Sequence, residues 1–256
     1  MTLEIVAAGA ARFGIALGPE QFDRLARFVA LLLERNQHLN LTRIVEPAEV
    51  ERRHLLDSLT CAVPFLDRLA QGGDQGADDG APAALTCLDV GSGGGLPGIP
   101  LAIWFPMLQV TLLESTAKKS AFLREVVEAL DLGNVTVQTG RAEDVGRDPA
   151  ARDRFDLVVA RALAPLPVAL ELCLPFARKG GLVVLPRGSD LAAQLPDGEA
   201  AAAKLSARLR PPIPLDDPEL PPGRSLVVAE KLGPTPHRYP RRAGQPAKQP
   251  LAARMV

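Results

Sequence analysis

One stretch of the chain, LTCLDVGSGGGLPG at Leu85–Gly98, constrains the fold more than any other. It starts as a short apolar run, passes an acid at Asp89 and becomes rich in glycine. Pro97 marks the expected first turn of a helix, where the missing N–H of proline costs nothing. A buried parallel strand that leads into a glycine turn and a helix is how a doubly wound α/β sheet binds a nucleotide-like ligand. The stretch therefore predicts an α/β fold with a ligand site at this turn.

Composition limits the class of protein. The 256 residues are 47% hydrophobic and 23% charged, which is ordinary for a soluble globular protein. The longest apolar runs are too short to span a membrane, and no basic segment of an export signal precedes them. The cysteines Cys61, Cys87 and Cys173 lack CxxC spacing, which favours a reduced chain without structural zinc. We expect a cytoplasmic protein with no metal site, and a net charge of −1 leaves room for a local basic face.

Hydrophobic spacing predicts a helical layer over residues 1–70. Apolar residues recur at helical spacing from Pro19 to Gln37. A second helix is expected from Pro47 towards Cys61, and a turn at Asn40–Arg43 separates the two. The buried side of the second helix is predicted to be Val50, Leu55, Leu56 and Leu59. Residues 71–84 are rich in glycine and aspartate and predict a flexible connector.

Strands and helices are expected to alternate over the region 85–232, which forms the α/β domain. The expected strands after the glycine turn are 110–114, 135–137, 155–161, 181–185 and 224–230, the last one antiparallel and near the sheet edge. The expected helices are 116–130, with Gly133 as its C-cap, and 165–176. Residues 190–223 show no clear pattern. The proline-rich basic tail 233–256 predicts either disorder or a contact with an RNA backbone, in which Tyr239 stacks on a base.

The glycine turn itself fits three interpretations. Gly93-x-Gly95-x-x-Gly98 matches a dinucleotide fingerprint, Asp89-x-Gly91-x-Gly93-x-Gly95 is typical of S-adenosylmethionine-dependent methyltransferases, and a turn that only shapes a loop is the third. Glu114 ends the next strand about 20 residues later, where an acid binds ribose hydroxyls. Asp89 favours the methyl donor, because a carboxylate attracts a sulfonium or an ammonium group and repels a pyrophosphate. The segment Arg141–Asp144 can place an acid beside an adenine, so the methyltransferase interpretation is preferred.

The chain lacks the motifs of two common nucleic-acid methyltransferases. No cysteine follows a proline, as cytosine C5 chemistry requires, and Ala160–Pro167 stands where adenine N6 enzymes have an Asn/Asp-Pro-Pro-aromatic box. The sequence therefore suits a substrate atom that is already nucleophilic. Guanine N7 is such an atom, since it has a free lone pair and no proton to lose.

Several longer segments resemble one family, the glucose-inhibited division protein B family, bacterial methyltransferases that modify a guanine N7 in 16S rRNA of the small ribosomal subunit. The resemblance extends from about Pro19 to Leu251. The segments that carry it are Asn40–Thr42, Arg53–Ser58, Asp89–Pro100, Ala160–Ala162 and Tyr239–Lys248. It implies a Rossmann-like class I S-adenosylmethionine-dependent methyltransferase fold with an N-terminal helical layer.

The motif and the resemblance together assign candidate site residues. Those expected at the S-adenosyl-L-methionine site are Asp89, Gly91, Gly93, Leu96, Glu114, Ala142, Glu143 and Arg161, the last also as a positioning residue. Those expected to face the RNA are Asn40, Arg53, His54, Asp57, Ser58 and Arg187. No general base is assigned, because N7 loses no proton. Arg187 stands where the family commonly has a lysine.

Some of these assignments have a plainer alternative. Arg161 is otherwise a buried ion-pair partner of Glu143 or Asp144, and Arg53 with His54 is otherwise the polar edge of an amphipathic helix. For the whole protein, the resemblance implies 16S rRNA of the small ribosomal subunit as the partner. We also expect a monomer that needs neither a metal nor a membrane. The alternatives are a nicotinamide-dependent oxidoreductase and a non-catalytic RNA-binding ribosome assembly factor with the same fold.

Overall fold

The computed structural model describes residues 2–70 and 84–252. Apart from Ala84, the predicted connector 71–84 lies outside the described residues, and so does Arg254 of the predicted tail. The proposed division at residues 70, 84 and 232 stays a prediction.

A mixed β-sheet forms the centre of the molecule. In the described part of the chain it has eight strands, with the order β3-β2-β1-β4-β5-β8-β6 and β7 paired to β8. The strands are β1 (Thr86–Val90), β2 (Gln109–Glu114), β3 (Val135–Thr139), β4 (Phe155–Val159), β5 (Ala177–Arg187), β6 (Ala207–Leu209), β7 (Ile213–Pro214) and β8 (Ser225–Lys231). Neighbours from β3 to β5 are parallel, whereas β8 is antiparallel to β5. The strand order reverses between β1 and β4, which is where doubly wound sheets bind ligands.

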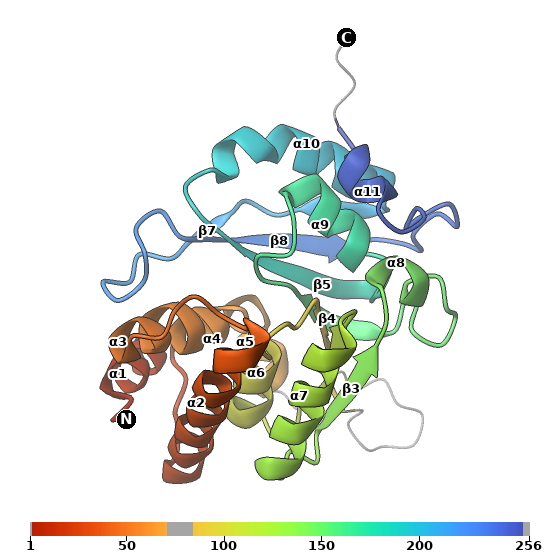
Figure 1. Ribbon diagram of the computed structural model, residues 1–256. Helices are drawn as coiled ribbons and strands as arrows, with labels where there is room; N and C mark the ends of the chain where they lie inside the picture. Colours follow the sequence, from red (N-terminus) through yellow and green to blue (C-terminus); the bar gives the residue numbers. More distant parts are fainter. Residues whose placement is uncertain (1, 71–83, 253–256) are drawn as a thin grey trace.

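Helices cover both faces of the sheet (Figure 1). The N-terminal layer contains α1 (Glu4–Arg12), α2 (Pro19–Leu39), α3 (Pro47–Val50), the π-helix η1 (Glu51–Leu56), α4 (Asp57–Thr60), the 3₁₀ turn η2 (Val63–Phe65) and α5 (Leu66–Ala70). The later helices are α6 (Gly98–Trp104), α7 (Ala117–Ala129), α8 (Ala142–Val145), α9 (Leu166–Cys173), α10 (Leu191–Lys204) and α11 (Gln245–Lys248).

The alternation of side chains along each strand divides the core in two. Cys87 of β1 points to the face covered by the N-terminal layer, α6 and α7, and the next residue, Leu88, points to the face covered by α9 and α10. Figure 1 shows these two helical layers on opposite sides of the sheet. The predicted α/β architecture with an N-terminal helical layer is confirmed.

The helix expected from Pro47 towards Cys61 forms with one irregularity. Its predicted buried residues Val50, Leu55, Leu56 and Leu59 are all fully buried. The six residues Glu51–Leu56 are π-helical, however, so the turn is wider than that of an α-helix. Such segments are common at functional sites, and this one contains Arg53 and His54.

Two predicted helix ends are wrong. Helix α7 ends at Ala129 with Leu130 as its C-cap, and the left-handed residue that follows is Asp131, with φ of 50°, because aspartate tolerates this conformation. Gly133 is therefore not the C-cap. Pro97 is the N-cap of α6 instead of lying inside its first turn, and the helix begins at Gly98.

The C-terminal part is more ordered than its composition suggests. The region 190–223, which shows no clear sequence pattern, contains α10, β6 and β7. Residues 233–252 pack on the α9 face, where Tyr239 and Leu251 are each only 7% exposed. The prediction of disorder is wrong for these residues, and buried Tyr239 does not present its ring for stacking on a base.

The close packing behind the glycine turn gives the first prediction. A Cβ at Gly98 would collide with Leu112 Cδ2 and lie 2.8 Å from Asp89 Oδ2. We expect Gly98→Ala to lower the free energy of unfolding by about 1–3 kcal/mol, as overpacking of a core does. Urea denaturation followed by circular dichroism measures the change. Gly133→Ala is the control, because nothing lies within 4 Å of the place that its methyl group would take, and equal losses in the two variants would contradict the prediction.

Candidate functional site

A pocket opens at the carboxyl ends of the parallel strands. Its lining comes from the ends of β1 and β2, from the loops after β1, β2, β3 and β4, and from helices α8 and α9. The residues are Val90, Gly91, Leu113, Ser115, Gly140, Arg141, Ala142, Glu143, Leu163 and Leu172. The position matches the reversal of strand order, where the loops on either side of β1 separate. We call this the donor pocket. Of the residues expected at the methyl-donor site, Gly91, Ala142 and Glu143 line it.

The glycine turn is shaped by backbone conformation and close contact. Gly91, Gly93 and Gly95 all have positive φ, which residues with side chains rarely adopt. A Cβ at Gly91 would also lie 2.7 Å from Leu163 Cδ1, so a side chain here would collide with the wall of the pocket. The glycines therefore keep open a space that a ligand can approach closely.

Two acids hold the turn in place. Glu114 Oε2 accepts a hydrogen bond from Gly93 N–H at 2.9 Å, and Glu114 Oε1 accepts one from Thr116 N–H at 2.7 Å. Asp89 is fully buried, and its Oδ2 accepts from Gly98 N–H at 3.0 Å. Among the described residues, neither side chain is part of the pocket lining. The observed contacts of both acids are with backbone N–H groups of the turn and of the segments next to it. Their roles at the methyl donor stay predictions.

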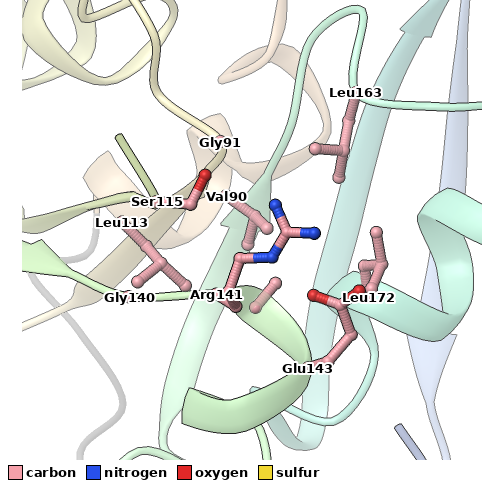
Figure 2. A pocket seen from close by; sticks show the side chains of 10 residues that line it. Val90, Gly91, Leu113, Ser115, Gly140, Arg141, Glu143, Leu163 and Leu172 are labelled. Atoms are coloured by element: carbon pink, nitrogen blue, oxygen red, sulfur yellow. The ribbon is translucent and has the colours of Figure 1, made fainter. Parts of the chain in front are cut away.

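Glu143 and Arg141 bring charge to the donor pocket. Figure 2 shows the Arg141 side chain in the middle of the pocket, with Leu163, Leu172 and Glu143 around it. Glu143 is 8% exposed, and its Oε1 accepts a hydrogen bond from Gly244 N–H at 3.0 Å. A largely desolvated carboxylate beside an apolar wall suits a ligand with an amino group on a flat ring.

A second cavity of about 400 Å³ lies on the other side of the loop after β4. Arg161 and Ala162 of this loop line the second cavity, and Leu163 lines the donor pocket. We call the second cavity the arginine cleft. Its lining residues are Ile44, Arg53, His54, Asp57, Arg161, Ala162, Gly188, Ser189, Pro221, Pro222 and Arg224. Three arginines against one aspartate make the cleft positively charged.

Asp57 connects the arginines of the cleft. Its carboxylate, with 3% of the side chain exposed, accepts two hydrogen bonds from Arg224, at 2.6 Å and 2.5 Å. It also pairs with Arg161 at 3.4 Å. Arg161 further donates to the carbonyl oxygen of Arg53 at 2.6 Å. Arg161 is thus a partly buried ion-pair partner, as its plainer alternative states, but its partner is Asp57 and not Glu143 or Asp144.

His54 is held in the neutral state. Burial and the neighbouring Arg161 lower its pKa to about 4. Its Nδ1 lies 3.2 Å from Arg161 Nη2, and its Nε2 lies 2.7 Å from Thr42 Oγ1. Nδ1 also lies 3.1 Å from the carbonyl oxygen of Arg53. Both ring nitrogens are therefore engaged within the protein.

The other residues expected to face RNA have mixed positions. Arg53, His54 and Asp57 line the arginine cleft. Ser58 does not, because it is fully buried and its hydroxyl donates to the carbonyl of His54 one helical turn away, so the expectation for Ser58 is wrong. Asn40 ends α2 in a left-handed conformation with an exposed side chain, and its RNA contact stays a prediction.

Arg187 lies beside the cleft at the end of β5. Its Nη1 donates to the carbonyl of Ala164 at 2.7 Å, and burial lowers its pKa. Its Nε is buried and makes no hydrogen bond with the described residues. The next residues, Gly188 and Ser189, line the cleft. The expected phosphate contact of Arg187 stays a prediction.

Leu96 and Arg161 lie elsewhere than the donor pocket. Leu96 is 7% exposed and packs in the core on the side of the N-terminal layer. Arg161 belongs to the arginine cleft. Within the described ranges, neither residue lines the donor pocket, so the structure gives no direct contact for them there.

Sequence reasoning missed Arg224 and Arg141. Arg224 directly precedes β8, and Ser225 pairs with Arg187 in an antiparallel register. The start of an antiparallel strand lies at the same sheet edge as the ends of its parallel neighbours, so the predicted direction of this strand was a usable signal. Arg141 follows β3 at the same edge, in the segment whose Ala142 and Glu143 are the predicted site residues.

The described residues lack two other kinds of site. They contain no cluster of three or more His, Cys, Asp or Glu side chains placed to hold a metal ion. No helix among them is long and apolar enough to cross a membrane.

Asp89 gives a prediction on pH. Burial raises its pKa to about 7, from an ordinary value of 3.8. Between these values the folded protein binds a proton that the unfolded chain releases, so this group makes stability fall as pH rises through about 7. His54, with its pKa lowered from 6.5 to about 4, contributes the opposite slope between these two values, and this contribution is the same in the wild type and in Asp89→Asn. We therefore expect Asp89→Asn to lose less stability than the wild type between pH 5 and pH 8.

Urea denaturation at both pH values measures this difference. Glu128→Gln, at an exposed position on α7, is the matched control and should keep the slope of the wild type. If the stability of Asp89→Asn changed with pH as much as that of the wild type, the raised pKa of Asp89 would be contradicted.

Comparison with solved structures supports the fold. The crystal structure of a mutant of MtNAS superposes with a TM-score of 0.51 and 16% sequence identity, over 84% of this chain and 75% of the other. The same mutant in complex with S-adenosylmethionine gives the same TM-score over 83% of this chain and 76% of the other. The predicted Rossmann-like class I methyltransferase fold is confirmed.

Sequence comparison gives more specific relatives. The family model for rRNA small subunit methyltransferase G matches residues 21–210. A ribosomal RNA small subunit methyltransferase G from Roseiflexus sp. (strain RS-1) is 42% identical over 93% of this chain and 95% of its own length. One from Deinococcus deserti is 42% identical over 97% of this chain and 96% of its own length. The chain therefore belongs to the rRNA small subunit methyltransferase G family.

Proposed function

We propose that this protein transfers a methyl group from S-adenosyl-L-methionine to N7 of a guanine in 16S rRNA of the small ribosomal subunit. One observation carries the proposal beyond family membership. The donor pocket and the arginine cleft lie on the two sides of a single loop, with Arg161 and Ala162 on one side and Leu163 on the other. A methyl donor and an RNA nucleotide bound in these cavities would meet at this loop.

The residues of the donor pocket fit the cofactor. Glu143 offers a carboxylate for the adenine amino group, and the open glycine turn lets the ligand approach the backbone. Glu114 ends β2 beside Ser115 of the pocket, where its carboxylate oxygens have lone pairs left for ribose hydroxyls. When bound, S-adenosyl-L-methionine supplies an electrophilic methyl group on a sulfonium.

The residues of the arginine cleft suit an RNA substrate. Its positive charge attracts the phosphate backbone. This charge comes from the arginines, because His54 is neutral. The guanine must leave its stack to bring N7 in line with the methyl group. Arg161 is held by Asp57 and by the Arg53 carbonyl at the loop between the cavities, and it can orient the base or its phosphate.

The acid and the histidine that line the cleft are both engaged by other groups of the protein, so neither is free to act as a general base. This supports N7 as the acceptor, because N7 needs no base. Asp57 is neutralised by two arginines, and both ring nitrogens of His54 are engaged. The N7 lone pair forms the new bond to the methyl carbon while the carbon–sulfur bond breaks, and no proton has to be removed. Positioning therefore supplies most of the catalysis. We further propose that the protein acts in the cytoplasm as a monomer.

The central prediction is methyl transfer to RNA. With labelled S-adenosyl-L-methionine, we expect incorporation into small ribosomal subunits or 16S rRNA from cells that lack the gene, and mapping of the product to N7-methylguanine. Arg161→Gln should lower kcat/KM by about 100-fold, because a misplaced substrate loses alignment. Arg208→Gln, at an exposed arginine paired with Glu230, is the control and should keep full activity.

The same assay tests the alternatives. Correctly folded protein that binds rRNA without incorporating label would favour the non-catalytic assembly factor. Titration that shows tight NAD(P)H binding and no S-adenosyl-L-methionine binding would favour the oxidoreductase.

A second prediction concerns Arg224. A lysine at this position keeps the charge but not the two parallel hydrogen bonds to Asp57. We expect Arg224→Lys to lower kcat/KM for RNA by about 10-fold and to leave the dissociation constant of S-adenosyl-L-methionine unchanged, because Arg224 lines the cleft and not the donor pocket. Steady-state kinetics and calorimetry measure the two quantities. A weaker binding of S-adenosyl-L-methionine with unchanged RNA kinetics would contradict this role.

A further inference from the structure

The C-terminal segment Tyr239–Gly244, which we call the tail clasp, contacts both helices beside the donor pocket. On α9 it pairs Arg241 with Glu171, which is fully buried. Arg241 Nε donates to Glu171 Oε1 at 2.8 Å and Nη2 to Oε2 at 2.5 Å, and the backbone N–H of Arg241 donates to Oε1 at 2.9 Å. An ion pair with this geometry fixes one point of the tail firmly on α9.

On α8 the tail clasp makes contacts at both ends of the helix. Gly244 N–H donates to Glu143 Oε1 at 3.0 Å. At the other end, Pro240 packs so closely on Gly146 that a Cβ there would lie 3.1 Å from Pro240 Cγ. Arg147 Nε donates to the Pro240 carbonyl at 2.9 Å. The tail clasp thus holds α8 and α9 at a fixed separation.

A further arginine secures the beginning of the tail. Arg152 Nη1 donates to the carbonyl oxygens of Tyr239 and Gly146, at 2.9 Å and 2.8 Å, and its Nη2 donates to that of Thr235 at 2.5 Å. These bonds use main-chain acceptors of the tail, so they depend on its path and not on its side chains. The tail is built into the fold at this point.

The two helices that the clasp holds form one wall of the donor pocket. Ala142 and Glu143 come from α8, and Leu172 comes from α9, next to Glu171. A buried carboxylate needs hydrogen-bond donors to stay in place, and Gly244 N–H is such a donor for Glu143. Gly244, with φ of 78°, adopts the left-handed conformation that glycine favours.

We propose that the tail clasp positions Glu143 in the donor pocket, so that Arg241 and Gly244 are positioning residues for S-adenosyl-L-methionine and not RNA contacts. The proposal rests on the proposed function for the identity of this ligand. It assigns the conspicuous basic tail to the methyl donor, although its composition suggests nucleic-acid binding.

The test measures binding of S-adenosyl-L-methionine to full-length protein by calorimetry, without RNA. The double variant Glu171→Leu/Arg241→Ala removes both partners of the ion pair and leaves no buried charge unpaired. We expect it to raise the dissociation constant about 10-fold, since Glu143 loses its fixed position. Arg241→Lys, which keeps the charge, should give an intermediate value. Lys248→Ala changes an exposed cation of the tail outside the clasp and should bind like the wild type.

A double-mutant cycle separates positioning from general stability. We call the double variant Glu171→Leu/Arg241→Ala the clasp variant. If the clasp acts through Glu143, the clasp variant should weaken binding much less in a Glu143→Ala background than in the wild type. Kinetics add a second readout, because the clasp variant should raise KM for S-adenosyl-L-methionine with kcat and KM for RNA nearly unchanged. Thermal unfolding without ligand identifies a variant that fails to fold, and Arg241→Lys then replaces it.

Three results would overturn the proposal. They are wild-type affinity in the clasp variant, a full loss that persists in the Glu143→Ala background, and a raised KM for RNA with unchanged binding of the methyl donor. Failure of the proposed function is distinguishable, because wild-type protein itself would then not bind S-adenosyl-L-methionine.

Discussion

The buried carboxylate of Asp57 holds together three parts of the chain that are far apart in sequence. Asp57 follows the π-helix of the N-terminal layer, Arg161 follows β4, and Arg224 precedes β8. A carboxylate buried this deeply would strongly destabilise the fold if it were unpaired. The ion pairs that it makes therefore also hold the two arginines in place. The shape and the charge of the arginine cleft follow from this one cluster. The N-terminal layer is therefore part of the site and not only a cover for the sheet.

The donor pocket depends on a different arrangement, in which backbone groups and acids hold one another. Glu114 binds the N–H groups of Gly93 and Thr116, and Asp89 binds that of Gly98. Glu143 is the acid that reaches the pocket, and the tail binds it from behind through Gly244. Acids that looked equivalent along the chain thus have different tasks, because burial and backbone donors decide which carboxylate is exposed to a ligand.

Much of the fold was predictable because it rests on local pattern. The alternation of apolar strands with amphipathic helices, the glycine turn and the antiparallel final strand were all visible in the sequence. The wrong helix end at Gly133 shows the limit of such reasoning, since Asp131 adopts the left-handed conformation two residues earlier. The region 190–223 was unclear because six of the 14 residues of α10 are alanine and the helix contains Pro196, so its apolar face is weak.

The sequence by itself determined the class of fold, the position of the glycine turn and the resemblance to an rRNA-modifying family, because these depend on residues that are close together in the chain. Only the tertiary structure decided that Asp57 pairs with Arg161 and Arg224, that Ser58 turns its hydroxyl into its own helix, and that the basic tail lies against the donor pocket. The pairings of Asp57 and of the tail join residues between 70 and 167 positions apart. They follow from how the sheet brings strand ends to one edge, which no local pattern records.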